Sequence, residues 1–151
     1  MTGRSALWHA PPVLEDWQVA LLEQERTATL GTIAHDGRAH LVPVCFAFEA
    51  GAIVIAIDEK PKRGAQLARL RNLARDARAS VLVHHYDEDW TELAWVRCEG
   101  KAEVLARGEL RPAALAALRA RYPWYTSMAL EGLPLIVAEI ERAVSWRWTD
   151  G

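Results

Sequence analysis

Three cations stand close together in the segment IDEKPKRGAQL, which covers residues 57–67. Lys60, Lys62 and Arg63 surround Pro61, after an apolar run and before a stretch with helical periodicity. The first backbone N–H groups of a helix have no partners within the helix, so together with these cations they form a place for an anion. Phosphate is the usual ligand of such a place. The alternative is a solvated loop whose cations only maintain solubility, since most charged segments are plain surface.

A proline interrupts the strand-like segment HLVPVCF at Pro43. Because proline has no backbone N–H to donate, its strand is expected to be an edge strand or to carry a bulge. An edge strand would leave neighbouring N–H and C=O groups free to bind a planar heterocycle. A corner of a barrel, where strands also bend, is the alternative explanation.

Two tryptophans and an arginine occur together in YDEDWTELAWVR. Trp95 and Arg97 occupy the odd positions of a strand whose even positions are small and apolar, so both are expected on its non-core face. Trp90 lies in the acidic loop before that strand. An exposed indole is normally covered by a ligand or a partner subunit. A second copy of the chain is the more frequent cover, because homodimers are common.

The segment HHYDED contains metal-ligand types, His84, His85, Asp87 and Asp89. Adjacent histidines in a strand point to opposite faces, so His84 and His85 would not easily share an ion. The spacing fits no standard site, and we predict no metal centre.

The bulk composition favours a single domain over residues 1–151, with 51% apolar and 25% charged residues. The net charge is −2, from 18 basic and 20 acidic residues, so any anion site must be local. Cys45 and Cys98 form no CxxC pair and are expected to be buried thiols in a reducing compartment. Residues 1–12 lack the apolar core of a signal peptide, and no apolar stretch is long enough to span a bilayer. We therefore expect a cytoplasmic protein.

Hydrophobic periodicity predicts the elements that hold these residues. Helices are expected at Val13–Arg26, Gln66–Arg75 and Pro112–Arg121. Strands are expected at Thr27–His35, Arg38–Phe48, Ala52–Ile57, Ala79–Tyr86, Leu93–Leu105 and Pro134–Thr149. Asp36-Gly37 signals a hairpin between the first two strands, and Gly51 a second turn, so that the first three strands form a meander.

Apolar faces are predicted for the first helix and the last strand. The apolar face of the helix is expected to consist of Val13, Trp17, Ala20 and Leu21. The apolar face of the strand is expected to consist of Ile136, Ala138, Ile140, Val144, Trp146 and Trp148, and Arg142 interrupts this face. Six strands joined mostly as hairpins, with short helices at the margins, indicate a mainly β (α+β) protein with an antiparallel sheet closed into a small barrel.

Three segments together resemble the pyridoxamine 5′-phosphate oxidase-like split-barrel flavin-binding family, and more narrowly its deazaflavin-dependent oxidoreductase branch. They are ATLGTIAHDGRAHLVPVCFAF, IVIAIDEKPKRGAQLARLRNLARDARASVLV and YDEDWTELAWVRCEGKAEVL, which together span residues 27–105. The resemblance implies a six-stranded antiparallel split β-barrel with flanking short helices. It also implies a homodimer with a cofactor in each of the clefts between subunits.

The resemblance also assigns roles to residues. It implies that the cofactor phosphate meets Lys60, Lys62 and Arg63. It implies that the ring lies against the strand carrying Val42, Pro43 and Val44, with Ile57 and Asp58 on the ribityl side. It implies that Trp90, Trp95 and Arg97 approach a cleft from the later strands, either their own or that of the partner subunit.

Coenzyme F-420, a deazaflavin, is the favoured cofactor, and flavin mononucleotide (FMN) is the alternative. The phosphate loop here reads Lys-Pro-Lys-Arg and the chain ends in SWRWTDG, unlike the vitamin-oxidising members, so pyridoxamine phosphate is not the expected substrate. A polyglutamate tail would also need cations, and Arg38, Arg69 and Arg71 are candidates. The resemblance implies hydride transfer to an electron-poor small molecule. Tyr86, Tyr125 and His85 are able to supply a proton, but each is expected to be structural, and no catalytic residue is assigned.

Three other functions compete with this one. A nonenzymatic carrier would hold the same cofactor without turnover. A haem-handling split barrel would use the same fold. Nucleic-acid binding through RLRNLARDAR is not expected, because that helix contains Asp76 and no stacking aromatic residue. No membrane partner is expected either.

Overall fold

The computed structural model describes residues 12–57, 65–106, 108 and 110–149. The helices are α1 (Asp16–Gln24), α2 (Ala65–Arg75) and α3 (Leu110–Arg121), with short 3-10 helices η1 (Trp90–Glu92) and η2 (Pro123–Ser127). The strands are β1 (Ala28–Ile33), β2 (Ala39–Val44), β3 (Ala47–Glu49), β4 (Ala52–Ala56), β5 (Arg78–His85), β6 (Ala94–Leu105) and β7 (Leu135–Arg147). No helix in the described ranges is both long enough and apolar enough to cross a bilayer.

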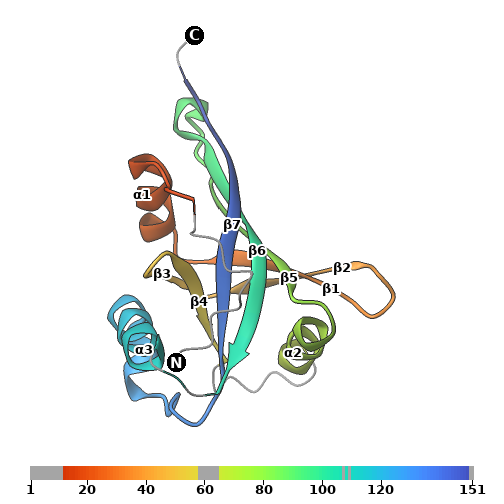
Figure 1. The fold of residues 1–151 in the computed structure, drawn as a ribbon. Coiled ribbons are helices and arrows are strands. Elements are labelled where there is room, and N and C mark those ends of the chain that lie inside the picture. Colours follow the sequence, from red (N-terminus) through yellow and green to blue (C-terminus); the bar gives the residue numbers. More distant parts are fainter. Residues whose placement is uncertain (1–11, 58–64, 107, 109, 150–151) are drawn as a thin grey trace.

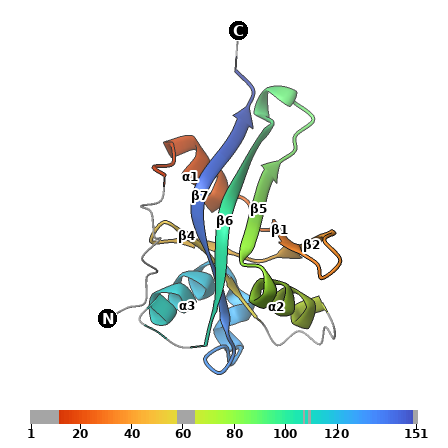
Figure 2. The same cartoon turned by 45° about the vertical axis from the view of Figure 1, so that its right-hand side comes forward.

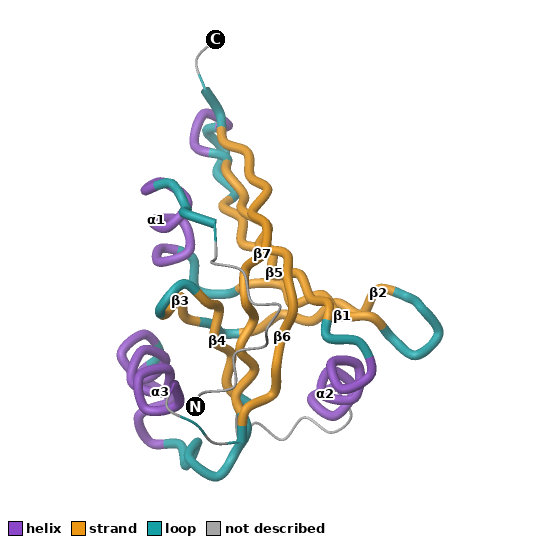
Figure 3. Tube along the Cα trace, viewed as in Figure 1, coloured by secondary structure: helices purple, strands orange, loops and turns teal. Residues whose placement is uncertain are grey.

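The strands form one curled antiparallel sheet in the order β2-β1-β5-β6-β7-β4-β3, a half-barrel in a mainly β, α+β fold. The long β6 and β7 run through its middle, and the β1–β2 hairpin projects from one side (Figure 1). Helices α1 and α3 lie on one side of this central pair and α2 on the other (Figure 2). The ends of β5, β6 and β7 beside η1 extend away from the rest of the sheet (Figure 3).

The strand that contains Pro43 is an edge strand, as one of the two sequence interpretations requires. Within the described residues, β2 has β1 as its only neighbour in the sheet, and Pro43 pairs with Thr29. The turn at Asp36-Gly37 forms the predicted β1–β2 hairpin, with Gly37 at a φ of 85°. That positive φ is easily reached only without a side chain.

The predictions of six strands and of a three-strand meander are wrong. The expected strand 38–48 is broken at Cys45 and Phe46 into β2 and β3, so that the described residues form seven strands. The Tyr122 hydroxyl accepts a hydrogen bond from the Phe46 N–H at 3.0 Å and lies 2.9 Å from the Phe46 carbonyl oxygen. Because a side chain takes over these backbone bonds, the ladder stops here. The chain then crosses to the far edge of the sheet, where β3 pairs with β4.

A bulge in β7 overturns the predicted apolar face of that strand. Glu99 of β6 pairs with Arg142, whereas the next residue, Gly100, pairs with Ile140. Glu141 is therefore an extra residue in β7, and every side chain beyond it is moved to the opposite face of the sheet. Ile136, Ala138 and Ile140 face the core as predicted, but Val144 and Trp146 face outward together with Arg142.

Glycine is required at position 100. A Cβ atom there would lie 1.9 Å from the carbonyl oxygen of Glu139, well inside contact distance. The closely approaching backbone at the bulge therefore excludes any side chain.

Helix α1 is shorter than predicted, because Gln18 accepts a hydrogen bond from the Glu15 N–H at 2.7 Å and marks the start of the helix. Of the predicted apolar face, Trp17 and Leu21 pack into the core, but the prediction is wrong for Val13, which is 97% exposed, and for Ala20, which is also exposed. The buried residues of α1 are Gln18, Leu21 and Leu22.

The core has two parts. The larger lies between α1, α2 and the inner face of the sheet, with Leu30, Phe46, Val83 and Val96 fully buried. The smaller lies between α3 and strands β3, β4 and β7. Both cysteines are free thiols; Cys98 is buried, and Cys45 is partly buried.

Candidate functional site

The outward face of the sheet brings distant segments together in one row. Strand register places Pro43 beside Thr29, Thr29 beside Leu82, Leu82 beside Arg97, and Arg97 beside Val144. Cross-strand partners in an antiparallel sheet share a face. The edge strand β2 and the middle strand β6 therefore present side chains to the same side of the molecule.

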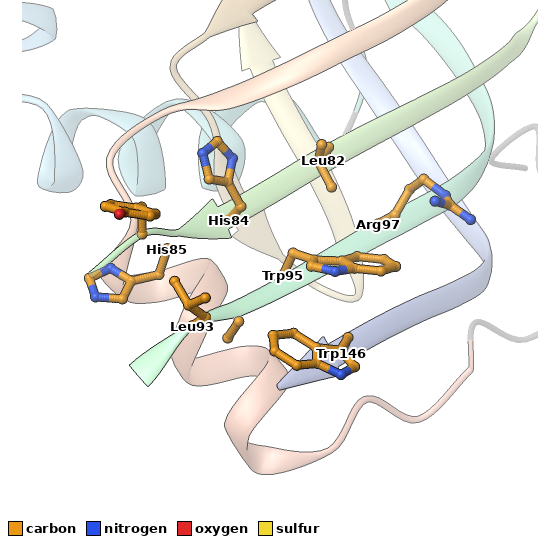
Figure 4. Close-up of a pocket in the computed structure, with 9 residues that line it drawn as sticks. Leu82, His84, His85, Leu93, Trp95, Arg97 and Trp146 are labelled. Atoms are coloured by element: carbon orange, nitrogen blue, oxygen red, sulfur yellow. The ribbon is translucent and has the colours of Figure 1, made fainter. Parts of the chain in front are cut away.

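A cavity of about 430 Å³ lies on this outward face, where β5, β6 and β7 extend toward η1. Its lining includes Leu82 and His84 of β5, Trp95 and Arg97 of β6, and Trp146 of β7 (Figure 4). Trp95 is the cross-strand partner of both His84 and Trp146. The volume falls within the range of small-molecule sites, roughly 300–1,000 Å³.

One end of the cavity carries an excess positive charge. The Nε of Arg97 lies 2.9 Å from one carboxylate oxygen of Glu99, and the Nε of Arg142 lies 3.1 Å from the other. Two guanidinium groups thus share one carboxylate. The guanidinium carbon of Arg97 lies 5.5 Å from the centre of the Trp95 ring, within cation–π distance.

His84 and His85 point to opposite sides of β5, as predicted from strand geometry. His84 is exposed on the outward face, whereas the Nδ1 of His85 lies 3.2 Å from the Glu25 carboxylate. The other ring nitrogen of His85 lies 3.7 Å from Asp87. His85 is therefore engaged with acidic groups on the other side of the strand end.

The loop before β6 is ordered by its own hydrogen bonds. The Asp89 carboxylate accepts bonds from the Thr91 N–H at 3.0 Å and the Thr91 hydroxyl at 2.6 Å. The bond from the Thr91 side chain is the main cause that lowers the pKa of Asp89. This cap holds η1 with Trp90 60% exposed.

The sequence-predicted site residues are only partly brought together. Pro43, Trp95 and Arg97 share the outward face. Val42 and Val44 are on the inward side of β2, and both pack into the core. Trp90 is exposed on η1 and does not line the cavity. The remaining predicted residues are Ile57, which is 6% exposed, and Asp58, Lys60, Lys62 and Arg63, which lie outside the described residues.

The three arginines considered for a polyglutamate tail have different surroundings. Arg38 is highly exposed and lies 3.4 Å from Asp36 in the β1–β2 turn. Arg71 is exposed on α2, whereas Arg69 is 6% exposed and belongs to the interior. Only Arg38 and Arg71 therefore present a cation on the surface.

Five of the cavity residues were not assigned to a site from the sequence: Leu82, His84, Leu93, Ala94 and Trp146. Leu82 carries no distinguishing signal in the sequence. Trp146 was assigned to the core, although Arg142 in the middle of the predicted apolar face was the sign that the face changes there.

Comparison with known proteins identifies the family. The family model described as pyridoxamine 5′-phosphate oxidase matches residues 14–147. The chain belongs to the pyridoxamine 5′-phosphate oxidase family. The family membership expected from the three sequence segments is thereby confirmed, and the split-barrel topology of this oxidase-like fold accounts for the curled sheet.

Solved structures share the fold of this oxidase family member. A conserved hypothetical protein from Mycobacterium tuberculosis, Rv2991, is 25% identical with a TM-score of 0.72, over 92% of this chain and 88% of that one. An FAD-binding protein from Mesorhizobium loti is 19% identical with a TM-score of 0.64, over 87% of this chain and 94% of that one. A heme-binding protein from Mycobacterium smegmatis is 20% identical with a TM-score of 0.70, over 92% of this chain but 57% of that one.

Proposed function

We propose that this protein is an oxidoreductase that uses a flavin or a deazaflavin to transfer a hydride to or from a small electron-poor organic molecule. The observation that carries the proposal is the shared outward face, which joins the free edge at Pro43 to the aromatic cavity at Trp95. Family membership supports a flavin-related activity. The FAD-binding protein of the same fold is consistent with it.

The residues present suit a phosphorylated cofactor with a flat ring. In the part of the chain that the structure describes, β2 has a neighbour on one side only, so backbone groups along its other side are available there to hydrogen-bond a heterocycle. Lys60, Lys62 and Arg63 precede α2, which begins at Ala65, so a phosphate bound there would meet cations and unpaired helix N–H groups. We favour coenzyme F-420 because of this basic sequence, with FMN as the alternative.

The bound cofactor supplies hydride transfer, and the protein supplies position and surroundings. Pro43 fixes the backbone of the edge on which the ring would rest, with Ile57 and Asp58 on the ribityl side. Trp95 and Trp146 give the adjacent cavity apolar walls, and Trp90 lies on the exposed loop before it. Arg97 offers a positive charge to the negative charge that develops on a reacting acceptor.

We further propose that the active form is a homodimer with its cofactors in the clefts between subunits. The outward face carries large apolar side chains, with Leu41 67% exposed and Trp146 43% exposed. Such surface normally meets a partner or a ligand. Sedimentation velocity with and without cofactor tests this directly, and a monomer in both conditions would refute it.

Cofactor titration tests the proposed function. Purified protein would be titrated with FMN and with coenzyme F-420 while cofactor absorption and fluorescence are followed. Saturable binding of one cofactor, followed by oxidation of its reduced form when menadione is added, is expected. Binding without turnover over a panel of quinones and enones would identify a carrier, and absence of binding by both cofactors would refute the proposal.

Haem handling is the second candidate, and His84 favours it. The exposed imidazole lies across from Trp95 in an aromatic cavity that also holds Arg97, a set able to ligate iron, cover a porphyrin and meet a propionate. The heme-binding protein of the same fold is consistent with this candidate. A Soret band that appears on haemin addition, and is lost in His84→Ala, would favour haem over a flavin.

A further inference from the structure

We infer that the cavity between β5, β6 and β7 binds a flat aromatic carboxylic acid, with the carboxylate at Arg97 and the ring on Trp95 and Trp146. Calling this molecule the acceptor substrate rests on the proposed oxidoreductase function. The binding site itself rests on the side chains that line the cavity.

The apolar part of the cavity selects a flat ring. Trp95 and Trp146 lie opposite each other on neighbouring strands, and Leu82 and Leu93 add aliphatic surface (Figure 4). Aromatic faces prefer offset or edge-on contact with other aromatic rings, which a flat ligand provides and an aliphatic ligand does not. The polar lining is confined to a few groups, so orientation depends on those groups.

The charge in the cavity selects an anion. Arg97 donates from its Nε to Glu99, and its two terminal nitrogens make no hydrogen bond within the described part of the chain. Arg142 binds the second oxygen of Glu99, so one carboxylate faces two guanidinium groups. One positive charge is therefore left over, and the free fork of Arg97 matches a carboxylate in two-point contact.

The direction of the ligand follows from the opposite end of the cavity. There the acidic groups Glu25 and Asp87 are engaged with His85 on the other side of β5. Tyr86 lies at this end, within 3.4 Å of Glu88. Among the described residues, no lysine or arginine lines this end, whereas at Arg97 a carboxylate meets surplus positive charge, so the ring extends from Arg97 toward His84.

The position of the cavity suits an acceptor beside the proposed cofactor ring. Leu82, at the cavity wall, is separated from Pro43 only by Thr29 of β1 along the same row. Two strand spacings amount to about 10 Å, which is the length of a fused three-ring system. A ring that starts on the β2 edge would thus end where the cavity begins.

Calorimetric titration of the cofactor-free protein with 2-naphthoate, 2-naphthamide and decahydro-2-naphthoate tests the ligand class. The wild type is expected to bind the naphthoate at least about tenfold more tightly than either analogue. Arg97→Met should reduce naphthoate affinity by about tenfold and leave naphthamide affinity unchanged. Trp95→Leu should weaken the binding of both aromatic compounds, so that naphthoate no longer binds more tightly than decahydro-2-naphthoate.

Two further variants keep the test independent of folding. Arg142→Met leaves Arg97 in place but allows Glu99 to neutralise it, so it should weaken naphthoate binding by about threefold. Lys101→Met removes an exposed cation farther along β6, outside the residues that line the cavity, and should not affect binding. Thermal melting of all variants checks that the fold is retained.

Three results would overturn the inference. The first is equal affinity of the wild type for naphthoate and naphthamide. The second is that Arg97→Met lowers the affinity for both compounds by the same factor. The third is displacement of naphthoate by a bound cofactor, which would assign the cavity to the cofactor. If naphthoate binds as expected while FMN and coenzyme F-420 do not bind, the proposed function fails and the ligand class of the cavity stands.

Discussion

Trp95 and Trp146 lie directly opposite each other on the outward face of β6 and β7. They do so because one extra residue, Glu141, reverses the face of β7 between Ile140 and Arg142. Without that bulge Trp146 would be on the core side, and the cavity would lose one of its walls. A backbone irregularity thus determines the composition of the candidate site.

Gly100→Ala should therefore destabilise the protein and disturb the cavity together. The added Cβ would lie 1.9 Å from the Glu139 carbonyl oxygen, and relief of such a clash costs about 1–3 kcal/mol. Urea unfolding measures the loss. Gly132→Ala is the matched control, because nothing lies within 4 Å of a Cβ built there, and its effect should stay below about 1 kcal/mol. Equal stability of the two variants would contradict the bulge argument.

Tyr122→Phe should destabilise the protein at the point where the chain breaks between β2 and β3. The variant leaves the buried Phe46 N–H without the hydroxyl that now accepts its hydrogen bond at 3.0 Å, at a cost of about 1–3 kcal/mol of unfolding free energy. Chemical denaturation measures this loss. Tyr86→Phe removes an exposed hydroxyl and is expected to have no measurable effect on stability. A Tyr122→Phe protein as stable as the wild type would show that the hydroxyl is not needed.

Stability should fall at high pH because of Cys98. Burial raises the pKa of this thiol from 9.0 to about 11. Below pH 9 the thiol is neutral in both the folded and the unfolded chain, and this contribution to stability is fully present. Between pH 9 and 11 the unfolded chain ionises first, so stability falls as pH rises, by up to about 1.4 kcal/mol per pH unit.

Urea unfolding of wild type and Cys98→Ala at pH 8 to pH 10.5 checks this expectation, because the difference between them should shrink as pH rises. Val81→Ala is the control: Val81 is the cross-strand partner of Cys98 and is equally buried, but it has no proton to lose. The difference in unfolding free energy between Val81→Ala and wild type should not change with pH. A constant difference for Cys98→Ala as well would mean that the thiol does not titrate as described.

Neutralising Lys62 and Arg63 together should lower cofactor affinity far more than stability. Loss of two charge-assisted phosphate contacts is expected to raise the Kd for FMN or coenzyme F-420 by more than about tenfold, with little change in Tm. Lys62→Gln with Arg63→Gln would be compared with Arg78→Gln and Lys101→Gln, a cross-strand pair of exposed cations. Parallel losses of affinity and Tm in the first double variant would indicate a structural role for the basic segment instead.

Local sequence was enough to determine most elements and their type. Alternating small apolar residues predicted β6 nearly to the residue, and Asp36-Gly37 predicted the β1–β2 hairpin, because strand period and turn chemistry are properties of a few consecutive residues. The family could also be identified from the sequence, because three segments in a fixed order already indicated it. Pro43 predicted an edge strand or a bulge, because a missing N–H disfavours a regular central position, and the edge strand is what the structure has.

Only the tertiary structure decided which side chains meet. The break at Phe46 depends on a hydroxyl 76 residues away in the chain, and the bulge at Glu141 depends on the pairing of β7 with Gly100. Neither contact is visible in a local pattern, and each changes the path or the face of everything that follows it. Trp146 therefore belongs to the candidate site and not to the core, since one residue of strand register turns every later side chain to the other side.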